Sequence, residues 1–134
     1  MNPLSLIANL MLDKVTNWDT DSSQFPSQEE REKAPSLADA NVCTSVRLDA
    51  EDRHAVLLDL DVPAALVPSS TPGHSHLYVD VSVPTETYFR LLDVLAEAGV
   101  IETGYANVSK HRGGTSLRLP WIKKPDTSSQ EPPL

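Results

Sequence analysis

The chain has almost no cysteine: Cys43 is the single one among 134 residues. One thiol excludes an internal disulfide, and it excludes a zinc site built from cysteines. This composition fits a reducing cytosol, and we expect a cytoplasmic protein. A secreted protein without disulfides fits the same composition.

A long apolar run is also missing. The first 15 residues lack a basic leading segment and a small-residue cleavage site, and Asp13 and Lys14 interrupt their apolar pattern. A membrane-spanning helix needs about 20 consecutive apolar residues. We therefore expect neither a signal peptide nor a membrane span here, and no membrane partner.

Acidic residues are absent from residues 104–124, although the formal net charge of the whole chain is −8. That net charge argues against a general nucleic-acid coat protein, which needs a positive surface. The distribution indicates an acidic body followed by a basic C-terminal region. Its five positive residues are Lys110, Arg112, Arg118, Lys123 and Lys124.

Composition divides the chain into four parts. Residues 1–15 place apolar side chains at helical spacing and predict an N-terminal amphipathic helix. Residues 16–36 are polar and charged, and they predict a flexible linker because they cannot bury enough apolar surface to offset the entropy of ordering. Residues 37–124 form the expected compact domain, and residues 125–134 a disordered tail.

Within the compact domain, alternating apolar residues predict strands at 42–48, 54–60 and 76–81. The short run 64–67 reads as a strand extension or a turn. A helix is expected from Pro84 to Gly99. Two more strands, 100–108 and 115–119, would form a hairpin around Gly113 and Gly114. The expected fold is α+β: a mostly antiparallel, RRM-like sheet packed against one main helix, plus the N-terminal helix.

Two carboxylates end the predicted strand 54–60. Residues i and i+2 of a strand point to the same face, so Asp59 and Asp61 are expected to project together. Two carboxylates are what a hard cation such as Mg²⁺ or Mn²⁺ takes from a protein, with water and phosphate oxygens completing its shell. The alternative is an exposed strand end that carries two acids.

A Ser/Gly-rich turn follows these acids. Ser70, Gly73 and His74 could cradle a phosphate with hydroxyl and backbone N–H groups, and His76 could donate to it. The alternative is a polar β-turn formed for conformational reasons alone. His74 and His76 have no third nitrogen or sulfur ligand nearby, which argues against zinc.

A basic segment with an aromatic residue closes the domain. Arg118 and Lys123 could neutralise a triphosphate or a nucleic-acid backbone, and Trp121 offers a stacking face. The alternative is a solvated basic hairpin with Trp121 in the core, because small domains usually bury their tryptophan.

In this order, LLDLD, SSTPGHSHLYV and LRLPWIKK resemble the archaeo-eukaryotic primase superfamily, in particular the primase-polymerase domains of plasmids, phages and mobile elements. The resemblance covers residues 54–124. It implies that Asp59 and Asp61 bind a catalytic Mg²⁺ or Mn²⁺ ion. It also implies that His76 or His74 contacts nucleotide phosphates, and that Arg118 and Lys123 bind triphosphate or template.

The chain departs from this family in two ways. Family domains are larger, and they need a third acid, for which Asp80, Asp93 and Glu102 are the candidates. The resemblance thus implies a minimal or degenerate relative that binds nucleotide or nucleic acid, with nucleotidyl transfer weak or lost. A rival hypothesis is a non-enzymatic interaction protein that uses residues 3–15 and the acidic linker to bind a protein partner. A third is a homo-oligomer assembled through the N-terminal helix.

Overall fold

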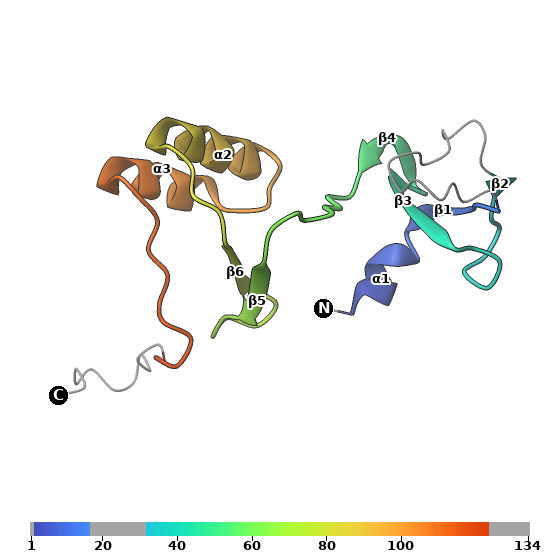
Figure 1. Cartoon of the computed structure of the whole chain (residues 1–134), viewed down its shortest axis with the longest axis horizontal. Coiled ribbons are helices and arrows are strands. Elements are labelled where there is room, and N and C mark those ends of the chain that lie inside the picture. The colour runs from blue at the N-terminus through green and yellow to red at the C-terminus, as the bar shows by residue number, and fades with distance from the viewer. Residues whose placement is uncertain (1, 17–31, 124–134) are drawn as a thin grey trace. The chain divides into compact units, whose positions relative to one another are not determined.

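The computed structural model describes residues 2–16 and 32–123. Contacts within the chain divide it into two compact units, Met1–Asp59 and Leu60–Leu134. Each unit has its own antiparallel sheet, and helices occur in both (Figure 1). The structure therefore confirms an α+β protein with antiparallel sheets, and RRM-like packing of one sheet on one helix stays a prediction. No helix in the described residues is long and apolar enough to cross a membrane.

The first unit is a four-stranded sheet with strand order β2-β1-β3-β4. Each neighbouring pair is antiparallel. A short helix precedes the sheet. The elements are α1 (Pro3–Ile7), β1 (Leu10–Lys14), β2 (Glu32–Lys33), β3 (Val42–Arg47) and β4 (Ala50–His54).

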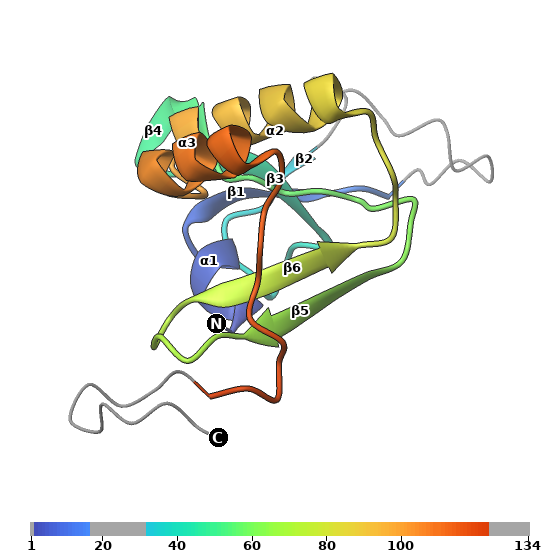
Figure 2. The same ribbon diagram turned by 90° about the vertical axis from the view of Figure 1, so that its left-hand side faces the viewer.

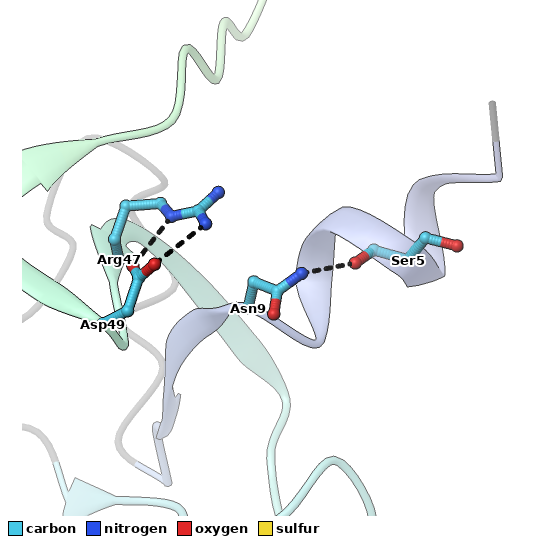
Figure 3. Close-up of polar contacts among 4 residues, drawn as sticks. All are labelled: Ser5, Asn9, Arg47 and Asp49. Carbon is cyan, nitrogen blue, oxygen red and sulfur yellow. Dashed lines mark hydrogen bonds and ion pairs between the residues drawn. The ribbon is translucent and has the colours of Figure 1, made fainter.

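The N-terminal helix is much shorter than its apolar spacing predicts. Asn2 caps α1 through its side chain, and the side-chain amide of Asn9 donates to the Ser5 carbonyl oxygen at 3.0 Å just past its end (Figure 3). The helix expected over residues 10–15 is wrong, because this stretch pairs with β3 and buries Leu10 completely. Tertiary pairing overrides a weak local helical pattern.

Polar contacts hold β1 in the sheet. The Thr44 hydroxyl donates to the Met11 carbonyl oxygen at 2.9 Å. The Asn41 side chain bonds both the N–H and the carbonyl oxygen of Val15, each at 2.8 Å. The Thr44 bond satisfies the Met11 carbonyl where the register between β1 and β3 shifts, and the Asn41 bonds satisfy Val15 just past the end of the strand.

The prediction for the next two strands is half right. β3 confirms the strand expected at residues 42–48. The strand expected at residues 54–60 is wrong, because β4 begins at Ala50 and ends at His54. The chain turns at Leu48 and Asp49, so that residues 50–54 take the place beside β3. Residues 55–60 belong to no strand, although the Ala55 N–H still donates to the Ser45 carbonyl oxygen of β3 at 2.8 Å.

The second unit contains one hairpin and two helices: β5 (Ala64–Pro68), β6 (Ser75–Val79), α2 (Thr85–Glu97) and α3 (Thr103–Arg112). The run 64–67 is a strand, and β6 confirms most of the strand expected at 76–81. The register runs from Ala64 opposite Val79 to Pro68 opposite Ser75. Figures 1 and 2 both show α2 and α3 side by side.

The helix expected from Pro84 is confirmed. Pro84 occupies its N-cap, and Gly99 follows its end with a φ of +79°, a left-handed conformation that favours glycine. Leu92 is the large apolar side chain that α2 buries.

The strands expected at residues 100–108 and 115–119 are wrong. Residues 103–112 form α3, and Gly113 (φ +85°) ends that helix instead of turning a hairpin. The small residues Ala106 and Ser109 of this stretch are buried. Small side chains let α3 approach α2 closely, and that contact decides between helix and strand.

Candidate functional site

The turn between β5 and β6 gathers three of the predicted phosphate-binding residues. The Ser69 N–H donates to the His74 carbonyl oxygen at 3.0 Å, and the His74 N–H donates to the Thr71 carbonyl oxygen at 3.0 Å. Gly73 takes the left-handed conformation with φ +79°. The structure thus places Ser70, Gly73 and His74 together on one exposed turn.

His76 lies two residues further on, in β6 opposite Val67, and it is half-buried. Alternation places it on the same face of the hairpin as Tyr78. His74 is fully in the turn. His76 is therefore near the turn, but it is one of the residues of β6 that pair with β5.

Asp61 lies at the opposite end of the hairpin. It precedes β5, whose first residue is paired with the last residue of β6. Asp80 is at the same end, since its N–H donates to the Pro63 carbonyl oxygen at 2.8 Å. A five-residue strand spans about 13 Å between its first and last residues. Mg²⁺ binds oxygen at about 2.1 Å, so one ion cannot join Asp61 to a phosphate held in the turn by direct bonds.

Asp59 is the last residue of the first unit. Neither Asp59 nor Asp61 is in a strand, so the expected same-face projection has no strand to support it. Both side chains are exposed. No group of three or more His, Cys, Asp or Glu residues capable of holding a metal occurs in the described residues. Metal binding by Asp59 and Asp61 stays a prediction.

One of the candidate third acids has another partner, and a second lies at a helix end without a side-chain capping bond. Asp93 accepts from the Lys110 ammonium at 2.6 Å, between α2 and α3. Glu102 is the N-cap residue of α3. Among the three candidates, Asp80 alone is on the hairpin that carries Asp61.

The basic segment is exposed, and within the described residues 115–123 it belongs to no strand or helix. It runs away from the end of α3 (Figure 1), and it turns at residues 119–122, where the Ile122 N–H donates to the Leu119 carbonyl oxygen at 3.0 Å. Arg118 and Lys123 are exposed. Trp121 is 73% exposed, so the interpretation that places it in the core is wrong. One hydrogen bond of 2.6 Å joins the start of the segment to α2, between the hydroxyls of Thr115 and Tyr88.

The first unit carries a charged cluster that was not predicted from the sequence. At the β3–β4 turn, the Arg47 guanidinium donates to both carboxylate oxygens of Asp49, at 3.2 and 3.4 Å (Figure 3). The hydrogen bond and the charge of Arg47 lower the pKa of Asp49, and the charge of Arg53 adds to this. Alternating charges around a Leu-Asp turn are the signal that could have revealed it.

The low pKa of Asp49 gives a test of this contact. A depressed acid pKa contributes stability above the unfolded pKa of about 4, and that stability is lost as pH falls through the folded pKa. We expect Asp49→Asn to be slightly less stable than the wild type at pH 6, with the difference vanishing in acid. Urea unfolding over this pH range measures it. A constant difference across the range would contradict the ion pair.

Comparison with known proteins adds no family to this geometry: no protein-family model, curated protein or solved structure has significant similarity to the chain.

Proposed function

We propose that this protein is a non-enzymatic interaction protein, and that residues 117–123, the docking segment, bind an apolar groove with an acidic rim on a partner protein. The observation that carries the proposal is the exposure of large apolar side chains between basic ones. Leu119, Trp121 and Ile122 are 53%, 73% and 51% exposed, and Arg118 and Lys123 flank them. An exposed apolar cluster of this kind marks an interaction site.

Charge complementarity defines the partner. The docking segment lies in the stretch without acids, residues 104–124, in a chain that is otherwise acidic. An acidic rim would pair with Arg118 and Lys123, and an apolar floor would accept Leu119 and Trp121. Tryptophan and arginine are the residues that most often dominate binding energy at interfaces.

A protein groove fits this segment better than a nucleic acid does. Trp121 could stack on a base. The aliphatic side chains Leu117, Leu119 and Ile122 find no matching surface on phosphates, whereas an unpaired peptide segment docks its side chains in apolar pockets of a partner protein. The segment therefore favours a protein partner over a template strand.

The docking segment is also a better candidate for the contact with a partner protein than residues 3–15, which the rival hypothesis named. Residues 10–14 are committed to the sheet as β1, and α1 has five residues, with Leu4 54% exposed. The acidic linker at residues 17–31 lies outside the described residues. The exposed apolar side chains of the docking segment support the proposed contact better than those of residues 3–15 do.

Charge reversal tests the proposal. A partner captured by the tagged full chain is purified and titrated by calorimetry against wild type, Arg118→Glu/Lys123→Glu and the control Arg90→Glu, which alters an exposed arginine on α2. We expect the double variant to bind at least about tenfold more weakly and the control to bind normally, with salt weakening the wild type more than the double variant. Equal binding by the double variant, or loss of capture after nuclease treatment, would overturn it.

A second function, nucleotide binding by a primase-polymerase-like domain, is supported by one observation. Ser70, Gly73 and His74 share one closed, exposed turn, which is a local arrangement that can receive a phosphate. Metal ligation by Asp59 and Asp61, and phosphate contacts from His76, Arg118 and Lys123, belong to this proposal as predictions from the resemblance.

Ligand-induced stabilisation tests the second function. A nucleoside triphosphate with Mn²⁺ should raise the melting temperature by mass action, because it binds the folded chain only. The Asp59→Ala/Asp61→Ala variant should lose the rise if the acids hold the metal, and His74→Ala should lose it if the turn holds the phosphates. No rise in the wild type would remove this function and leave the interaction proposal intact.

A further inference from the structure

The first unit contains an open pocket beside the β3–β4 turn, with a volume of about 320 Å³. This size is at the lower end of the range of pockets that bind small molecules, about 300–1,000 Å³. Its lining is rich in groups that bind anions. The lining residues are Arg47, Asp49, Ala50, Arg53, His54 and Ala55.

A bulge in β4 creates the pocket. Val46 is opposite His54, whereas the next residue of β3, Arg47, is opposite Ala50. Three residues of β4 therefore lie between two ladder positions that are adjacent on β3. Bulges re-aim side chains and are common beside binding sites. Arg53 lies within this irregular stretch and shares the pocket lining with Arg47.

The charges of the lining favour an anion. Two guanidinium groups, Arg47 and Arg53, face one carboxylate, Asp49, so the lining carries a net positive charge inside a sheet unit that is acidic overall. Glu51 and Asp52 are exposed on the same bulge but do not line the pocket. Guanidinium groups bind phosphate through two parallel N–H donors.

His54 is positioned to add a further contact. Its Nδ1 atom and the Ser45 hydroxyl are 2.7 Å apart. That bond occupies one ring nitrogen and fixes the ring, so Nε2 is the nitrogen that can meet a ligand. The Ala55 N–H is held by the Ser45 carbonyl oxygen at 2.8 Å, which anchors the far side of the bulge.

From this geometry we propose that the β3–β4 pocket binds the phosphate group of a small phosphorylated molecule. Arg53 and Arg47 hold the phosphate oxygens, and Asp49 competes with the ligand for Arg47. All residues of this site belong to the first unit, whereas the docking segment and the β5–β6 turn belong to the second.

The test is a titration of the full chain at constant ionic strength, followed by NMR signals of the arginine Nε–H groups and of the Ala50 and Ala55 amides. Inorganic phosphate, glycerol phosphate and sulfate are the probes. We expect saturable shifts confined to these signals, with glycerol phosphate tighter than phosphate if the pocket also contacts the organic part. Equal affinities for glycerol phosphate and inorganic phosphate would mean that free phosphate is the ligand.

Three variants make the outcome decisive. Arg53→Gln should weaken binding about tenfold, because it removes a charge-assisted hydrogen bond. Asp49→Asn should tighten it about two- to fivefold by releasing Arg47, an improvement that a merely structural pair would not give. Arg90→Gln, which removes one exposed arginine on α2 outside both candidate phosphate sites, should leave the shifts unchanged. Non-saturable shifts, or the same affinity in Arg53→Gln as in the wild type, would overturn the proposal.

Discussion

Leu92→Ala should unfold the C-terminal unit. Leu92 is 3% exposed, and Ala106 is the other buried apolar residue in the described part of that unit. Replacing a buried leucine by alanine costs about 2–5 kcal/mol, from lost transfer energy and the cavity that remains. Small domains have only a few kcal/mol of stability in total, so this single change should remove most of it.

The neighbouring residue provides a matched control. Leu91 belongs to the same helix and has the same side chain, but it is 47% exposed. Leu91→Ala should therefore cost less than about 1 kcal/mol. Urea unfolding followed by circular dichroism gives the two free energies, and amide exchange in α2 and α3 assigns the loss to this unit. Equal losses in the two variants would contradict the burial of Leu92.

The sequence predicted elements best where a local signal agreed with tertiary packing. α2 was predictable because Pro84 and Gly99 lie at the two ends of a strongly amphipathic stretch. β3 was predictable because its alternation also matches a partner strand on each side. In both cases the local preference and the packing point to the same structure.

The sequence failed where tertiary contacts override the local pattern. Residues 10–14 fit a helix by spacing, and the pairing with β3 makes them a strand. Residues 100–108 were expected to form a strand, and contact with α2 makes residues 103–112 a helix. Such choices depend on partners that are distant in the sequence, and no local pattern contains that information.

The candidate site was predictable only within one turn. The Ser/Gly-rich turn gathers Ser70, Gly73 and His74 as expected, because a hairpin turn is a local structure. The distance from that turn to Asp61 was not predictable, since it depends on β5 being a separate strand. The sequence left open whether Trp121 is exposed or buried, because the answer depends on the segment having no strand partner in the described residues.

Trp121→Ala should have the largest effect on partner binding. A central interface tryptophan typically contributes about 2 kcal/mol or more, so we expect an affinity loss of at least about 30-fold. The fold should be unaffected, because the side chain is 73% exposed and its removal leaves no cavity.

Leu91→Ala is the control, since it removes exposed apolar surface from the same unit, outside the docking segment. Titration of the purified partner measures both variants. Equal affinities of Trp121→Ala and Leu91→Ala for the partner would mean that exposed apolar surface in general drives the association, and would contradict the proposal. A loss of affinity in Trp121→Ala alone, with unfolding at the wild-type urea midpoint, would identify the docking segment as the binding site.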